Sequence, residues 1–159
     1  MHFAIDDPDF WYQYPEEADY LRPIVETGRE NGVPTSIFVM GDPFDENTPC
    51  FVLFKMPEGG RLPRHGHDCQ RFEVLLRGNM TSGGMPVNPG DVMTAEPGEF
   101  YGPQEAGPGG YIVCEYFSRL KGSYEIIWET KRGPFVENVL RGWANKIERG
   151  TIEPTGGNS

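Results

Sequence analysis

The stretch "RHGHDCQRFEVLLRG", residues 64–78, places two histidines one residue apart and then enters a run typical of a β-strand. On an extended chain, residues two apart point to the same side. His65 and His67 can therefore present two imidazole nitrogens to one point, and Gly66 leaves the backbone between them unobstructed. Imidazole is a ligand for Zn, Fe, Cu and Ni. The pair is a candidate for half of a metal site; the alternative is two solvent-exposed side chains in a loop.

Length and charge limit the kind of protein. A chain of 159 residues predicts one domain with a real core. Its net charge of −10 disfavours a nucleic-acid partner, because phosphate binding needs clustered positive charge. Three widely spaced cysteines disfavour a disulfide framework and a structural zinc held by sulfur. With no signal-like start and no apolar run of the ~20 residues that a membrane helix needs, we expect a cytoplasmic protein without membrane contact.

The middle of the chain alternates with a period of two. Gly- and Pro-rich turns separate the apolar segments, with no helical pattern between them. Many short β segments punctuated in this way predict a mainly β fold, an antiparallel double-sheet barrel or sandwich. The main strands are expected at 35–40, 50–56, 71–77, 91–96, 110–118 and 123–129, with shorter ones at 61–65 and near Met80.

The two ends differ from the middle. Residues 1–15 are rich in aromatic side chains and are expected to pack, as an arm, on the barrel or on a partner subunit. A helix is predicted over 16–31, and an amphipathic helix over 134–149. The expected organisation is one domain, made of an N-terminal arm and helix (1–34), a barrel (35–130) and a C-terminal helix and tail (131–159).

Two motifs in the middle of the chain resemble the signatures of the cupin superfamily. The first is GGRLPRHGHDCQRFEVLLRG and the second is NPGDVMTAEPGEFYGP, in the family's order and at its usual separation. The matching residues are Gly59, His65, His67 and Gly78 in the first motif and Gly90, Asp91, Pro97 and Gly98 in the second. The resemblance covers about residues 35–130. It implies a double-sheet β-barrel with a pocket at one end, commonly assembled as a homodimer.

The chain departs from the family at two ligand positions. Arg71 stands where the family usually has a glutamate, and Tyr101 stands where it usually has its last histidine. Some small cupins resemble this chain in that arginine and in the Y-G-P turn. They often carry a histidine just after the turn, where this chain has Gln104. A guanidinium repels a divalent ion, so either Arg71 points away, or it pairs with Glu73, or no metal binds.

The facing of the strand 71–77 is open on the residues alone. An ordinary half-buried strand would place its apolar set, Phe72, Val74 and Leu76, in the core. The cupin resemblance implies the reverse, with Arg71, Glu73, Leu75 and Arg77 facing the pocket. An inward Arg71 needs an anion, and a substrate carboxylate held bidentately and an internal pair with Glu73 are equal candidates.

The resemblance favours an enzyme that acts on a small organic molecule bearing a carboxylate or an enol. In this hypothesis His65 and His67 hold one divalent transition metal (Fe, Mn, Zn, Ni or Cu). Glu73 or Tyr101 then moves protons, and Arg71 and Gln104 contact the substrate. Dioxygenase, lyase, isomerase and cyclase chemistries all remain open. Two alternatives stand beside it: a metal-free cupin that uses His/Tyr acid–base chemistry, and a non-catalytic cupin that only binds a small molecule.

Overall fold

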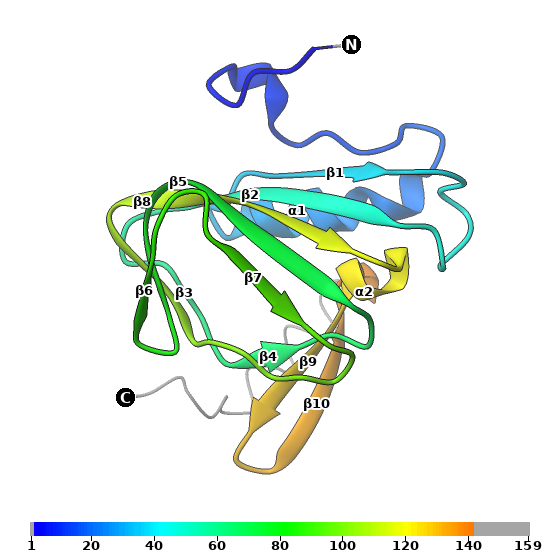
Figure 1. The fold of residues 1–159 in the computed structure, drawn as a ribbon. Helices are drawn as coiled ribbons and strands as arrows, with labels where there is room; N and C mark the ends of the chain where they lie inside the picture. The colour runs from blue at the N-terminus through cyan, green and yellow to red at the C-terminus, as the bar shows by residue number, and fades with distance from the viewer. Residues whose placement is uncertain (1, 142–159) are drawn as a thin grey trace.

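The computed structural model describes residues 2–141, and in this part of the chain the fold is built mainly from two antiparallel sheets (Figure 1). The larger sheet has the order β1-β2-β8-β5-β6, with β3 paired to β8 and β7 paired to β5. Its strands are β1 (Thr35–Val39), β2 (Cys50–Met56), β3 (Arg61–Leu62), β5 (Arg71–Ser82), β6 (Met85–Val87), β7 (Val92–Ala95) and β8 (Gln104–Phe117). The antiparallel β fold predicted for the middle of the chain is confirmed.

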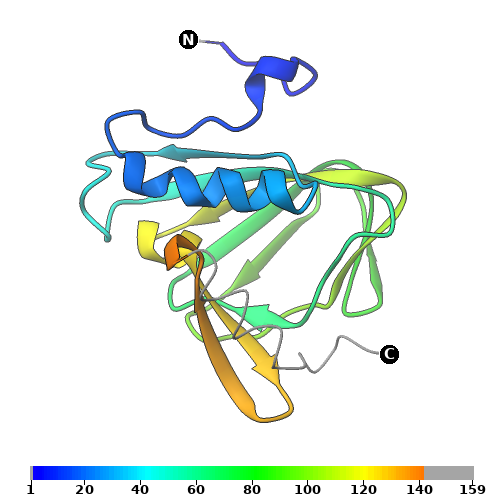
Figure 2. The ribbon, with the colours of Figure 1, turned by 180° about the vertical axis from the view of Figure 1, so that it is seen from behind.

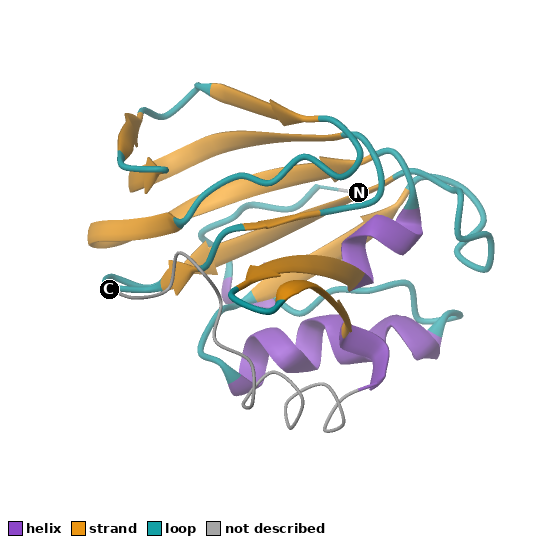
Figure 3. Cartoon of the chain, turned by 90° about the horizontal axis from the view of Figure 1, so that it is seen from below, coloured by secondary structure: helices purple, strands orange, loops and turns teal. Residues whose placement is uncertain are grey.

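The smaller sheet has the order β10-β9-β4 and faces part of the larger one (Figure 1). Its strands are β4 (His65–Gly66), β9 (Glu125–Thr130) and β10 (Gly133–Asn138). The α-helices are α1 (Arg22–Glu30), which packs on β1, and α2 (Leu120–Tyr124), which joins β8 to β9. Figures 2 and 3 show α1 and α2 on one side of the strands. None of the helices in residues 2–141 is long and apolar enough to cross a membrane.

The helix predicted over 16–31 is confirmed, but the α-helix begins later than predicted, at Arg22, and ends at Glu30. A 3-10 turn, η2 (Asp19–Leu21), leads into α1, and Pro23 lies in the first turn, where its missing N–H costs no hydrogen bond. Ile24 and Val25 are buried against the sheet. Gly32 has a φ of +70°, a conformation in which glycine ends a helix without steric cost.

The amphipathic helix predicted over 134–149 is wrong for the residues that the structure describes. Residues 133–138 form β10, which pairs with β9 from Gly133 opposite Thr130 to Asn138 opposite Glu125. A 3-10 turn, η3 (Val139–Arg141), follows, and 142–149 lies outside the described residues. Pairing with β9 overrides the weak helical preference, because six residue pairs between β9 and β10 satisfy the backbone groups that the two strands turn toward each other. Pro134 is tolerated because β10 is an edge strand.

The aromatic arm packs on the chain's own sheet, one of the two placements predicted for it. The Tyr12 amide donates to Thr35 O at 2.9 Å, and the Ile37 amide donates to Gln13 O at 2.8 Å. Phe10, in the 3-10 turn η1 (Pro8–Phe10), is buried and lies against Phe38 of β1. The arm therefore lies along the outer edge of β1.

Candidate functional site

The polar face of β5 points into the molecule. Arg71, Glu73 and Leu75 are 4%, 0% and 0% exposed, whereas Phe72 and Leu76 are 39% and 41% exposed. This is the facing that the cupin resemblance implied. The alternation ends at an irregularity between Leu75 and the exposed Arg77, so Arg77 turns outward, against the prediction. An inserted residue of this kind rotates the rest of a strand.

Arg71 is paired with two buried carboxylates. Its Nη2 contacts Glu73 Oε2, and its Nε donates to Glu115 Oε2 at 2.8 Å. Gln104 Nε2 donates to the same oxygen of Glu73 at 2.8 Å. Glu115 lies directly across from Glu73 in the pairing of β5 with β8. The geometry supports the internal-pair alternative for Arg71, with a second acid added to it.

Tyr101 joins the two sequence motifs. Its backbone forms an isolated bridge with His65, in which the His65 amide donates to Tyr101 O at 3.1 Å and the Tyr101 amide donates to His65 O at 2.9 Å. The phenol hydroxyl lies 3.0 Å from His67 Nε2. The Arg71 guanidinium lies 3.8 Å from the centre of the Tyr101 ring, a cation–π arrangement. One tyrosine thus contacts both the arginine and the histidine pair.

Backbone carbonyls fix the tautomers of both histidines. His65 Nδ1 lies 2.7 Å from Pro63 O, and His67 Nδ1 lies 2.8 Å from Gly122 O. A carbonyl oxygen only accepts, so each Nδ1 carries the proton and each Nε2 presents a lone pair. The Tyr101 hydroxyl therefore donates to His67.

Burial keeps these groups uncharged. It lowers the pKa of His65 to about 3, and it also lowers the pKa of His67. Burial raises the pKa of Tyr101 well above its ordinary value, although the nearby guanidinium opposes this shift. Near neutral pH both imidazoles and the phenol are neutral, and they act as hydrogen-bonding groups.

The histidines line a pocket of about 530 Å³ between the two sheets and α1. His65, His67, Glu115 and Trp128 are among the residues that line it. The remaining wall is largely apolar and includes Ile24, Val52, Phe54, Met56, Leu62, Phe117, Ile126 and Val139. Among the described residues, Arg71, Glu73, Tyr101 and Gln104 do not line this pocket. The structure brings all six predicted site residues into one connected cluster, but only the two histidines lie on the pocket wall.

The residues present do not fit the metal site that the sequence suggested. Two Nε2 lone pairs suit a metal ion, but within residues 2–141 no group of three His, Cys, Asp or Glu side chains could hold one. Glu73 is bonded to Arg71 and Gln104, and the Tyr101 hydroxyl already occupies His67 Nε2. The guanidinium beside that tyrosine also repels a cation.

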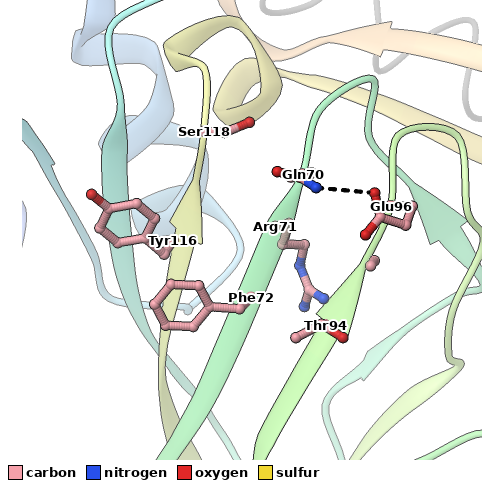
Figure 4. Close-up of a pocket in the computed structure, with 8 residues that line it drawn as sticks. Gln70, Arg71, Phe72, Thr94, Glu96, Tyr116 and Ser118 are labelled. Atoms are coloured by element: carbon pink, nitrogen blue, oxygen red, sulfur yellow. Dashed lines mark hydrogen bonds between the residues drawn. The ribbon is translucent and has the colours of Figure 1, made fainter.

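A second, smaller pocket of about 290 Å³ lies on the outer face of the large sheet, where β5 meets β7 and β8. Figure 4 shows Phe72 beside Tyr116, with the Arg71 side chain directed away from both. Gln70 Nε2 donates to Glu96 at 3.1 Å across this surface. The buried ionisable side chains therefore lie on the inner face of the sheet, away from this smaller pocket.

Sequence reasoning missed Glu115 and Trp128. In GYIVCEYFS, Glu115 alternates with Tyr111, Val113 and Phe117, so an acid among apolar inward positions was a readable signal. Trp128 follows two isoleucines in EIIWET, as an ordinary core residue would, and carries no comparable signal. Its place opposite His65, in the pairing of β4 with β9, follows only from the fold.

Among the solved structures similar to this chain, an RmlC-like cupin and a dioxygenase align over most of its length, and a third structure aligns over about half of it. An RmlC-like cupin protein from Ralstonia eutropha JMP134 aligns with 17% identity over 98% of this chain and 93% of that chain, with a TM-score of 0.56. An acetylacetone dioxygenase from Acinetobacter johnsonii aligns with 12% identity over 93% and 89%, with a TM-score of 0.53. Rhodobacter sphaeroides SigE in complex with the anti-sigma ChrR matches over 54% of this chain and 44% of that chain, with 21% identity and a TM-score of 0.45.

Comparison at the level of sequence adds no relative. No family model matches the chain, and no curated protein matches it. At these identities the structural likeness establishes the fold.

Proposed function

Because the chain has the cupin fold, we propose that it binds a small organic molecule in the pocket beside His65 and His67, and that it does so without a metal ion. The observation that carries this proposal is the hydrogen bond from the Tyr101 hydroxyl to His67 Nε2. That nitrogen is the atom a metal would need, and a neutral phenol occupies it. The pocket's volume and its largely apolar wall suit a small organic ligand.

Arg71 supports the same proposal. It stands at the position where cupins usually have a glutamate, and it supplies a permanent positive charge that two buried carboxylates neutralise. The guanidinium of Arg71 thus provides the positive charge in the interior that a metal ion would otherwise provide. In this proposal Arg71, Glu73 and Gln104 hold Tyr101 and the pocket floor in place and do not touch the ligand.

A second candidate is acid–base catalysis by His67 and Tyr101, which the 3.0 Å contact between them favours. The pKa directions count against it, because a base whose pKa is lowered and an acid whose pKa is raised both exchange protons poorly near pH 7. Binding is therefore placed first. A metal-dependent reaction, with Glu73 and Tyr101 as catalytic groups and Arg71 and Gln104 on the substrate, stays a prediction.

Metal analysis separates these functions. Full-length protein purified without chelator should contain far less than one transition-metal ion per chain by mass spectrometry of the elements. His65→Ala combined with His67→Ala should leave that content unchanged. Nearly one ion per chain, removed by the double substitution, would refute the proposal and support the metal-dependent enzyme. For metal-free protein, turnover of bound compounds that Tyr101→Phe abolishes would favour acid–base catalysis over binding alone.

A homodimer and a cytoplasmic location also belong to the proposal. Cupins commonly form dimers, and the exposed aromatic side chains on the outer face of the large sheet are compatible with a contact between copies. Light scattering on the full chain and on a chain that lacks residues 1–15 tests the dimer. A monomer in both cases would reject it.

A further inference from the structure

Aromatic side chains form a row across the outer face of the large sheet. By strand pairing, the row runs over Phe38 of β1, Phe51 of β2, Tyr116 of β8 and Phe72 of β5. The ring centres of successive neighbours are 5.1, 6.5 and 5.0 Å apart, and the interplanar angles are 21°, 8° and 12°. Phe51 and Tyr116 therefore each have a nearly parallel ring on both sides.

The row ends at Phe72, and the smaller pocket lies beside that ring. The next residue in the pairing is Thr94 of β7, whose side chain is too small to continue the row. Within residues 2–141, Tyr116 provides the only ring contact of Phe72. Phe72 is partly exposed, and Thr94 and Glu96 line the same pocket of about 290 Å³. A bound molecule can therefore take the place of the missing ring.

The charges around this pocket favour a cation. Gln70 Nε2 donates to Glu96 Oε2 at 3.1 Å and holds the carboxylate beside the pocket (Figure 4). Both residues are exposed, so a ligand can reach them. Arg71 also lines the pocket, but its guanidinium lies on the inner face, where Glu73 and Glu115 neutralise it. The net charge of −10 adds a general attraction for cations.

We infer that this pocket binds a weakly hydrated organic cation, such as a quaternary ammonium group, which stacks on Phe72 and pairs with Glu96. The negative face of an aromatic ring attracts a cation, and quaternary ammonium groups are typical ligands of such rings. Thr94 and Ser118 supply hydroxyl groups for a polar end of the ligand. The pocket is separate from the main pocket, so the inference does not depend on the proposed function.

Choline tests the inference, and neohexyl alcohol is its matched probe, because a carbon atom replaces the charged nitrogen and the shape is kept. Each is titrated into the full-length protein at pH 7.5 and low salt, and the NMR amide signals of Phe72 and Thr94 report binding at this site. Choline should bind at least about fivefold more tightly than the alcohol. Phe72→Leu, which removes the ring, and Glu96→Gln, which removes the charge, should each weaken choline binding about threefold.

Phe44→Leu is the matched control. Phe44 is an exposed aromatic side chain that does not line this pocket, and its replacement should leave choline binding unchanged. The amide spectrum of each variant shows whether it folds as the wild type does. If Phe72→Leu does not, then Glu96→Gln and the preference of the wild type for choline are the deciding measurements.

Three results would overturn the inference: equal binding of the two probes, no shift of the Phe72 and Thr94 signals with choline, or unchanged choline affinity in a folded Phe72→Leu or Glu96→Gln variant. A dimer that used the rings of Phe72 and Tyr116 would bury the pocket and give the second result, whereas a dimer through another part of the molecule would leave the pocket open. None of these results touches the proposed function, which fails on the metal analysis.

Discussion

The two faces of β5 contradict the usual rule for a half-buried strand. Its inner face carries Arg71 and Glu73, which are almost completely buried, and its outer face carries Phe72 and Leu76, which are partly exposed. The inner charges are tolerated because each one has a partner, whereas the outer Phe72 ring stacks on Tyr116 with ring centres 5.0 Å apart. In β5 the charged side chains of Arg71 and Glu73 therefore face the candidate site in the interior, and the apolar side chains of Phe72 and Leu76 face outward.

The sharpest test of this difference is Arg71→Met on the inner face. The substitution leaves Glu73 and Glu115 buried without their cation, and it should lower the free energy of unfolding by about 3–5 kcal/mol. Urea unfolding measures the loss. Adding Glu73→Gln and Glu115→Gln should recover most of the stability, because no uncompensated charge then remains. Unchanged stability of Arg71→Met would instead support the alternative in which Arg71 binds a substrate anion.

The second effect concerns pH and the buried histidines. In the folded chain the pKa of His65 is about 3, against 6.5 for an ordinary histidine, so between these values only the unfolded chain takes up this proton. Stability is thus retained above pH 6.5 and falls as the pH drops below it. The loss from His65 is about 2 kcal/mol at pH 5.

Comparison with His65→Gln isolates this contribution. The variant should lose less stability than the wild type between pH 7 and pH 5, as measured by urea unfolding at both values. Equal losses in the two proteins would mean that His65 is not held neutral by burial.

A smaller effect is expected from Tyr101→Phe. The change removes the hydroxyl that donates to His67 and keeps the ring against the Arg71 guanidinium, so it should cost about 1 kcal/mol. Thermal unfolding measures it. A loss as large as that of Arg71→Met would show that the hydroxyl, and not the ring, is the main contact of Tyr101.

The smallest effect is expected on the outer face. Phe72→Thr keeps a residue suited to a strand, and it should change the free energy of unfolding by less than about 1 kcal/mol because the ring is already 39% exposed. Urea unfolding at two protein concentrations checks this value. A larger loss that depends on concentration would show that a second copy covers this face.

Most of the fold could be predicted from the sequence, because the apolar pattern of each strand and the turns that bound it lie within a short stretch of the chain. The segment 50–56 is a nearly continuous apolar run bounded by Gly- and Pro-rich turns, and it forms β2 with the predicted bounds. The segment 134–138 was misread because its apolar spacing also suits a helix, and only the partner strand β9 decides between the two. The local sequence pattern of a segment does not show which strand will pair with it in the folded chain.

The site was partly predictable for the same reason. His65, His67, Arg71 and Tyr101 were found through motifs, and the structure brings them together. The pairing of Arg71 with Glu115 depends on the alignment of β5 with β8, two strands about forty residues apart in the chain. Position in the motif identified the residues, but their partners, and hence their roles, depend on contacts distant in sequence.

The N-terminal arm has a consequence for the behaviour of the protein in solution. Its backbone hydrogen bonds to Thr35 and Ile37 cover the outer edge of β1, which ends the large sheet. An uncovered edge of this kind can recruit the strand of another molecule and start aggregation. The arm therefore protects the protein from aggregation through this edge. Removing the arm exposes the backbone groups of β1 for pairing with another molecule, even though the pocket is left intact.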